Sequence, residues 1–181
     1  MEYNKNVSAE DAVKIIQSGN RVFVHGNAAT PMYILEALQK RYAELRNVEL
    51  VSITTFGNIN FNDPVYKKSF FMNSLFVSEN TRAVVNSDHG DYVPIFLSQI
   101  PQLFKTNILP LDVAIVQVSP PDAHGYCSLG TSVDIARAAV DTAKHIIAQV
   151  NSRMPRTHGQ GFIHVDKINS LVWHDLSLIH I

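Results

Sequence analysis

The chain has 181 residues, of which 46% are hydrophobic and 17% are charged. This length suits one domain with a sizeable core, and no run of about 18 uncharged apolar residues is present to cross a membrane. A net charge of −1 argues against nucleic acid or an anionic membrane as main partner, and the single cysteine excludes an internal disulfide. The first residues lack the apolar segment of a secretory signal, so we expect a cytoplasmic protein.

Short apolar strands alternate with helices along the chain. Ser8 is expected to cap a first helix that ends at Gly19, and Thr30 to cap a second one with Pro31 at its first position. The expected strands are 21–24, 48–53, 75–77, 111–118, 145–150 and 162–165, and the expected helices are 8–19, 32–45, 79–85, 94–104 and 131–144. This alternation predicts an α/β fold with a mostly parallel open sheet flanked by helices.

The loop after the first expected strand, His25-Gly-Asn-Ala-Ala-Thr-Pro31, is built from small residues. Small side chains let a ligand approach the backbone, and the following helix N-terminus offers N–H groups to a carboxylate, a thioester oxygen or a phosphate. The loop lacks the G-x-G-x-x-G pattern of dinucleotide sites. Two interpretations remain open: a ligand-facing loop, or a tight turn in which small residues merely fit.

A second loop, Ser119–Gly130, follows the apolar run 111–118 and carries Asp122, His124 and Cys127. Loops at the ends of parallel strands are where ligands bind in open α/β sheets. A Cys–His nucleophilic pair is one interpretation of these residues. The alternative is that Asp122 and His124 hold the turn through bonds to the backbone, while Cys127 is a small buried hydrophobe.

Two further groups of residues have competing interpretations. Asp88-His89-Gly90-Asp91 suggests metal ligands, but it has no metal-motif spacing, and a solvated turn is the alternative. No glutamate follows Glu79, and Glu79 itself fits the first turn of a helix capped by Ser78. We therefore expect neither a catalytic carboxylate nor a metal site within the chain.

Four ordered motifs resemble the N-terminal domain of the acetyl-CoA hydrolase/transferase family, in particular its 4-hydroxybutyrate and butyryl-CoA:acetate CoA-transferases. The resemblance covers nearly the whole chain, roughly Tyr3 to Asp175. The motifs are Gly26-Asn-Ala-Ala-Thr-Pro31, Asp91-Tyr-Val-Pro-Ile-Phe-Leu-Ser98, the run 119–130 and His158-Gly-Gln-Gly-Phe-Ile-His164.

The resemblance implies a CoA-transferase domain related in fold to sugar-phosphate isomerases, with the active site between two such domains. It also implies ping-pong chemistry, in which a glutamate attacks an acyl-CoA thioester and is converted, through an acyl anhydride, to a glutamyl-CoA thioester. Coenzyme A is then a substrate, and no resident cofactor is expected. The implied partners are an acyl-CoA, a short-chain carboxylate such as acetate or 4-hydroxybutyrate, the C-terminal catalytic domain, and further copies of the full-length enzyme; nucleic acid and membrane are not among them.

In this family the nucleophilic glutamate belongs to the C-terminal domain, which this chain lacks, so no catalytic residue is assigned here. The expected N-terminal domain covers residues 1–176. Residues 177–181 match nothing that the resemblance leads us to expect, and we interpret them as a foreign or disordered tail, with a genuine divergent tail as the alternative. The resemblance implies substrate contacts from Gly26, Asn27, Ala28, Ala29, Thr30, Pro31, Thr55, His124 and Gly125.

Three other functions stay open at this point. The protein can be the N-terminal part of an acetyl-CoA hydrolase, with water as acceptor, or a non-catalytic fragment that binds an acyl or CoA group. A relative of the sugar-phosphate isomerases requires an acid or base within these 181 residues, for which Glu79 is the candidate.

Overall fold

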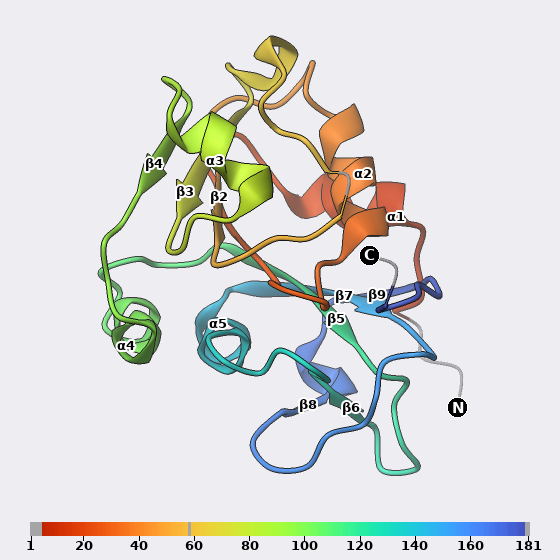
Figure 1. Cartoon of the computed structure of the whole chain (residues 1–181). Helices are drawn as coiled ribbons and strands as arrows, with labels where there is room; N and C mark the ends of the chain where they lie inside the picture. The colour runs from red at the N-terminus through yellow and green to blue at the C-terminus, as the bar shows by residue number, and fades with distance from the viewer. Residues whose placement is uncertain (1–4, 58, 180–181) are drawn as a thin grey trace.

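A parallel sheet lies at the centre of the computed structural model, which describes residues 5–57 and 59–179 (Figure 1). Among these residues the sheet has seven strands in the order β4-β3-β2-β1-β5-β7-β9. A separate antiparallel ribbon pairs β6 (Tyr126–Ser128) with β8 (Phe162–His164). The sheet strands are β1 (Arg21–Val24), β2 (Val48–Ser52), β3 (Phe70–Ser74), β4 (Gly90–Tyr92), β5 (Val113–Val118), β7 (His145–Val150) and β9 (Ser170–Trp173).

Helices cover both faces of this sheet, which confirms the predicted α/β architecture (Figure 1). On one face lie α1 (Ala9–Ala12), α2 (Met32–Lys40) and α3 (Glu79–Val85); on the other lie α4 (Ile100–Lys105), α5 (Ala136–Thr142) and the β6–β8 ribbon. Single 3₁₀ turns are η1 (Val13–Ile15), η2 (Pro64–Tyr66), η3 (Leu97–Gln99) and η4 (Val165–Lys167).

Strand β5 shows why two separate cores form. All six of its residues are buried, and successive side chains point to opposite faces. Val113 and Ile115 pack in the core under α1 and α2, whereas Ala114, Val116 and Val118 pack in the core under α4 and α5. A strand covered on both faces gives a continuous apolar run, which is why the sequence pattern predicted it well.

Several element boundaries differ from the prediction. The third strand is Phe70–Ser74 rather than 75–77, because its alternating burial places Phe70, Met72 and Ser74 inside, a pattern that polar Asn73 and Ser74 obscure. The helix expected at 131–144 covers only Ala136–Thr142. In place of the helix expected at 94–104, the α-helix is Ile100–Lys105, and the residues before it form extended chain and a 3₁₀ turn. The second helix ends at Lys40 rather than near residue 45, in a series of turns.

Three short strands, β4, β6 and β9, were not predicted. Gly90 begins β4 within the segment interpreted as a solvated turn, so the sheet edge replaces part of that turn. A Cβ atom at Gly90 would lie 2.4 Å from the carbonyl oxygen of Val84, so a side chain has no room there. The glycine in the segment Asp88–Asp91 therefore reflects close backbone packing rather than a loop.

Two of the three predicted helix N-caps are confirmed, whereas the first helix ends at Ala12 and its following 3₁₀ turn at Ile15, not at Gly19. The Ser8 hydroxyl accepts the N–H of Asp11 at 3.0 Å, and Ser78 forms a capping box with Thr81. The prediction for Thr30 is wrong, because Pro31 occupies the N-cap position without a side-chain bond. The hydroxyl of Thr30 is instead used inside the loop that precedes α2.

Residues 5–7 run beside the outer edge of β9. The N–H of Leu171 donates to the carbonyl of Lys5 at 2.8 Å, and the N–H of Val7 donates to the carbonyl of Leu171 at 3.0 Å. The indole N–H of Trp173 donates to Oδ1 of Asn6 at 3.1 Å. These bonds cover an edge that would otherwise expose unpaired backbone groups.

The described residues bear on two remaining predictions. No helix within residues 5–57 and 59–179 is long and apolar enough to span a membrane. Of the tail predicted at 177–181, residues 180 and 181 lie outside the described residues, as do residues 1–4 of the predicted domain.

Candidate functional site

The connection order of the sheet creates a crevice between the loops after β1 and β5. The chain runs outward from β1 to β4, and then returns to place β5 on the other side of β1. The loops that leave β1 and β5 therefore diverge to opposite faces. In open α/β sheets this switch point, at the carboxyl ends of the strands, is the usual ligand site.

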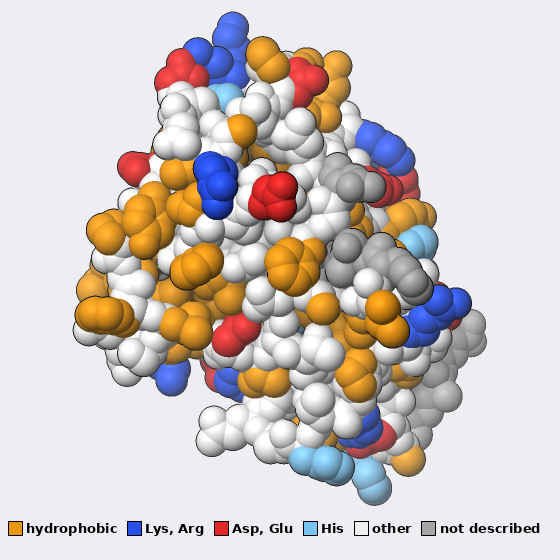
Figure 2. Space-filling view, viewed as in Figure 1, with side chains coloured by type: hydrophobic (Ala, Val, Ile, Leu, Met, Phe, Trp, Pro, Cys, Tyr) orange, Lys and Arg blue, Asp and Glu red, His pale blue; other side chains and the backbone are white. Residues whose placement is uncertain are grey.

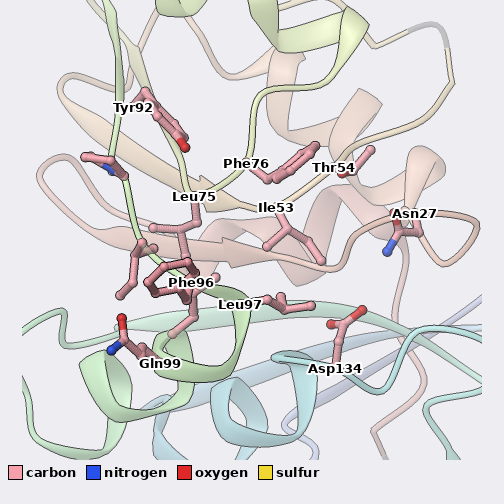
Figure 3. Close-up of a pocket in the computed structure, with 13 residues that line it drawn as sticks. Asn27, Ile53, Thr54, Leu75, Phe76, Tyr92, Phe96, Leu97, Gln99 and Asp134 are labelled. Atoms are coloured by element: carbon pink, nitrogen blue, oxygen red, sulfur yellow. The ribbon is translucent and has the colours of Figure 1, made fainter.

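A cavity of about 760 Å³ opens beside this switch point (Figure 3). Loops after four neighbouring strands, β1 to β4, contribute to its wall, together with the start of α4 and the segment before α5. Its size and mostly apolar lining are typical of small-molecule sites. The lining residues are Asn27, Ile53, Thr54, Leu75, Phe76, Tyr92, Pro94, Ile95, Phe96, Leu97, Gln99, Ile100 and Asp134.

Asn27 is held at one end of the cavity by strained, well-braced backbone. Its φ of 55° lies in the left-handed region, which asparagine tolerates better than most residues. Its N–H donates to the carbonyl of Thr54 at 2.6 Å, and its carbonyl accepts the Thr30 hydroxyl at 2.7 Å. The Thr30 oxygen in turn accepts the N–H of Phe56 at 3.1 Å. The loops after β1 and β2 are thereby joined.

Gly26 allows this close approach of the two loops. A Cβ atom at residue 26 would lie 2.8 Å from both the carbonyl oxygen of Thr54 and Cγ1 of Ile53. Two residues of the cavity wall would have to move to make room. The glycine is therefore required by packing at this position.

Replacing Gly26 with alanine is expected to lower the free energy of unfolding by about 1–3 kcal/mol, because the added methyl overpacks against backbone. Urea unfolding measures the loss. Gly161→Ala is the matched control, because its Cβ would meet a side-chain methyl of Val133 at 2.9 Å rather than backbone. Equal losses in the two variants would contradict the role given to the Thr54 contact.

His25 anchors the segment that carries Asp134. The imidazole is fully buried; its Nδ1 accepts the N–H of Gln117 at 3.1 Å, so Nε2 carries the proton and donates to the carbonyl of Ser132 at 2.6 Å. Burial lowers the pKa of His25 below its ordinary value of 6.5. The neutral ring thus ties β1 and β5 to the segment before α5, which brings Asp134 to the cavity.

The same interior holds a chain of amides. Nε2 of Gln117 donates to the carbonyl of Thr30 at 3.2 Å, and Nδ2 of Asn151 donates to Oε1 of Gln117 at 2.6 Å. The side chain of Asn151 also makes two hydrogen bonds to the backbone of Leu176. Its Nδ2 donates to the carbonyl of Leu176 at 2.8 Å, and its Oδ1 accepts the N–H of Leu176 at 3.3 Å. These bonds fix the base of the β1 loop to the region where the chain leaves β9.

The structure resolves the two interpretations of the loop 119–130 in favour of turn architecture. Oδ1 of Asp122 accepts the N–H groups of Tyr126 and His124, both at 2.9 Å, and these bonds help to lower the pKa of its carboxyl group. Cys127 is buried, and burial raises the pKa of its thiol to about 12. A thiol with this pKa is a poor nucleophile at neutral pH.

The predicted site residues fall into three places. Asn27 lines the 760 Å³ cavity, whereas Gly26 and residues 28–31 support it from the loop below. Thr54, and not Thr55, contributes to the wall of this cavity. Thr55 pairs with Asn27 in an isolated β-bridge and lines a second, smaller cavity. His124 and Gly125 lie at the tip of the β5–β6 turn, outside this cavity lining, where the carbonyl of His124 contacts Nε2 of His164 at 3.0 Å.

Asp134 and the segment after β4 were not proposed as site residues. Asp134 lay inside an expected helix, although it precedes α5. The segment 94–100 was also read as helix, yet Pro94 and the exposed side chains of Phe96 and Leu97 line the cavity. An unbroken apolar run after a proline is the signal that could have pointed to them.

The other candidates have structural roles. Glu79 occupies the first turn of α3, as predicted, and does not line the cavity. Asp88 pairs with Lys67, and Nδ1 of His89 lies 2.9 Å from the hydroxyl oxygen of Ser87. Within the described part of the chain, no group of three or more His, Cys, Asp or Glu side chains could hold a metal ion.

Comparison with known proteins agrees with the resemblance seen in the motifs. The family model for the acetyl-CoA hydrolase/transferase N-terminal domain matches residues 1–181. A succinyl-CoA:acetate/propanoyl-CoA:succinate CoA transferase of Fasciola hepatica is 40% identical over 163 residues, which is 89% of this chain and 34% of the relative. The 4-hydroxybutyrate coenzyme A transferase of Clostridium kluyveri is 41% identical over 168 residues, which is 93% of this chain and 39% of the relative.

Solved structures show the same fold. RipA from Yersinia pestis superimposes with a TM-score of 0.84 at 26% identity, over 95% of this chain and 42% of that one. The 4-hydroxybutyrate CoA-transferase of Porphyromonas gingivalis gives a TM-score of 0.80 at 28% identity, over 96% of this chain and 40% of that one. The chain thus spans well under half the length of these relatives. It belongs to the acetyl-CoA hydrolase/transferase family and corresponds to the N-terminal domain of that family.

Proposed function

We propose that this chain is the N-terminal half of a CoA-transferase that moves CoA between an acyl-CoA and a short-chain carboxylate such as acetate or 4-hydroxybutyrate. The observation that carries the proposal is the match to CoA-transferases along 89–93% of this chain but only 34–39% of theirs. The glutamates agree with this division, because no described glutamate lines the cavity and none follows Glu79.

In the proposed reaction a glutamate from the remaining part of the enzyme attacks the thioester carbonyl. The C–S bond breaks, giving an acyl anhydride and the CoA thiolate. The thiolate then attacks the glutamyl carbonyl of the anhydride, which releases the free carboxylate and leaves a glutamyl-CoA thioester. A second carboxylate reverses these steps and leaves as a new acyl-CoA. Coenzyme A is a substrate throughout, and the proposal includes no resident cofactor.

This chain would contribute the wall that holds the acyl group. The side-chain amide of Asn27 lies at the polar end of the cavity, where it can donate a hydrogen bond to the thioester oxygen as negative charge develops. We also propose that Gly26 and residues 28–31 keep this amide in place. A substrate contact by Thr55, His124 or Gly125 requires the remaining part of the enzyme to extend the site toward them.

The proposed partner of the cavity face is the C-terminal part of the longer enzyme. Phe76, Phe96 and Leu97 are 60%, 76% and 56% exposed around the cavity, and apolar side chains gather on this side of the surface (Figure 2). Large exposed apolar patches mark surfaces that another domain or protein covers. The full-length enzyme is further proposed to form a homo-oligomer.

An exchange assay tests the proposed function. The isolated chain, incubated with butyryl-CoA and labelled acetate, is expected to form no labelled acetyl-CoA above the uncatalysed rate, whereas the full-length enzyme should form it rapidly. Rapid exchange by the isolated chain would contradict the proposal that the nucleophilic glutamate comes from the remaining part of the enzyme. Release of free CoA by the full-length enzyme without any carboxylate acceptor would assign acetyl-CoA hydrolysis instead.

A further inference from the structure

The cavity has two chemically different ends. Asn27, Thr54 and Asp134 lie together at the end next to the switch point (Figure 3). The wall that leads away from them is formed mainly by apolar side chains, including Ile53, Leu75 and Phe96. The hydroxyl of Tyr92 and the amide of Gln99 are the polar groups on that far side. A ligand with a polar head and a largely apolar tail matches this lining.

The charges of the described cavity lining disfavour a second negative group on that tail. No lysine, arginine or histidine is among the described residues that line it, and Asp134 is its only charged lining residue. A carboxylate buried without a cation is strongly disfavoured, and a second carboxylate nearby adds repulsion. The described wall therefore offers no cation to the terminal carboxylate of a dicarboxylate, and its uncharged donors on that side are the hydroxyl of Tyr92 and the amide of Gln99.

We propose that the acyl-CoA partner of this protein carries an uncharged, apolar acyl chain of medium length, such as hexanoyl or octanoyl. This inference rests on the proposed function and specifies the acyl group that the cavity takes. The thioester lies at the end formed by Asn27 and Asp134, and the chain extends along Leu75 toward Phe96. An acetyl group offers one methyl group to this wall and leaves most of a cavity of about 760 Å³ unused.

The size of the expected effect follows from apolar burial. Each methylene transferred from water to an apolar wall improves affinity up to about fourfold. The series from acetyl through butyryl and hexanoyl to octanoyl should therefore show a steady fall in Kd while the chain still fits. Succinyl-CoA has the same number of acyl carbons as butyryl-CoA but carries a terminal carboxylate. We expect it to bind at least tenfold more weakly, because this carboxylate loses water on binding and meets no cation in the described lining.

Calorimetric titration of the 181-residue chain with these five thioesters tests the inference, with free octanoate and free succinate as parallel ligands. We expect one site per chain and a fall in Kd with acyl chain length. Succinyl-CoA should bind more weakly than butyryl-CoA, and succinate more weakly than octanoate. A flat series, or succinyl-CoA binding as tightly as butyryl-CoA, overturns the inference. If octanoate binds but the acyl-CoA thioesters bind no more tightly than free CoA, the result would contradict the proposed function, while the apolar binding site itself would be supported.

Two substitutions locate the site. Phe96→Ser should weaken octanoyl-CoA several-fold, whereas the matched control Ile108→Ser should not, because Ile108 is similarly exposed (71% against 76%) but does not line the cavity. Asp134→Asn keeps an oxygen to accept the N–H of Ile135 and should strengthen the binding of succinyl-CoA more than that of octanoyl-CoA. Equal losses in Phe96→Ser and Ile108→Ser, or no change for succinyl-CoA in Asp134→Asn, would place the acyl chain elsewhere.

Discussion

Replacing Phe104 with alanine is expected to lower the free energy of unfolding by about 3–5 kcal/mol, because it removes a fully buried aromatic ring from a packed core. The ring meets Phe23 of β1 edge to face, with centroids 6.0 Å apart and planes at 71°. It is the main apolar anchor of α4 against the sheet. Urea unfolding followed by circular dichroism measures the loss.

The exposed neighbour Lys105 supplies the control for this variant. Lys105→Ala lies in the same helix and should change the free energy of unfolding by no more than about 0.5 kcal/mol. Because α4 begins with Ile100, which lines the cavity, Phe104→Ala should also weaken octanoyl-CoA binding. A loss of stability below about 1.5 kcal/mol would show that Phe104 is not the anchor described here.

Lowering the pH from 7.5 to 5.0 is expected to reduce the free energy of unfolding through His25, by up to about 2 kcal/mol, the limit set by an unfolded-state pKa of about 6.5. Burial lowers the pKa of this imidazole in the folded state, whereas in the unfolded chain it returns to about 6.5. The unfolded state therefore binds a proton that the folded state excludes. Stability is full above pH 6.5 and falls as the pH drops below it.

The carboxyl groups contribute little to the change in stability between pH 7.5 and 5.0. Their lowered pKa values, as at Asp11 and Asp122, begin from ordinary values near 4, so the stability they contribute is lost only at lower pH. His25→Gln removes the titrating group and retains an amide that can donate to the carbonyl of Ser132. Urea unfolding at several pH values should give a flatter profile for this variant between pH 7.5 and 5.0. An unchanged slope would assign the acid sensitivity to another group.

Burial on both faces decided which parts of the fold could be predicted. β1, β5 and β7 are mostly apolar and almost fully buried and were found nearly to the residue, whereas edge strands such as β4 are short and half polar and were missed. Helix lengths were overestimated because an apolar pattern such as 94–104 does not distinguish a helix from extended chain that lines a cavity. The sheet class followed from the alternation of strands and helices, which needs no exact boundaries.

The candidate site was predicted only where it is local in sequence. The small residues around Asn27 indicate a ligand-facing loop by themselves, because a strand precedes them and a helix follows. The rest of the cavity joins Ile53, Leu75 and Phe96 from separate loops, and their apolar character alone predicts a core. Asp134 reaches the site because His25 holds the neighbouring segment, a long-range contact that no pattern along the chain reveals.

The pairing of residues 5–7 with β9 has a consequence for synthesis of the protein. Asn6 and Trp173 are 167 positions apart, so at ribosomal rates the first segment emerges about 8 to 33 s before its partner strand. In the last part of that interval, after β7 has emerged and before β9 follows, the edge of β7 exposes unpaired backbone groups that other nascent chains can pair with. We therefore expect the nascent chain to be most prone to pairing with other chains until β9 has emerged and paired with β7.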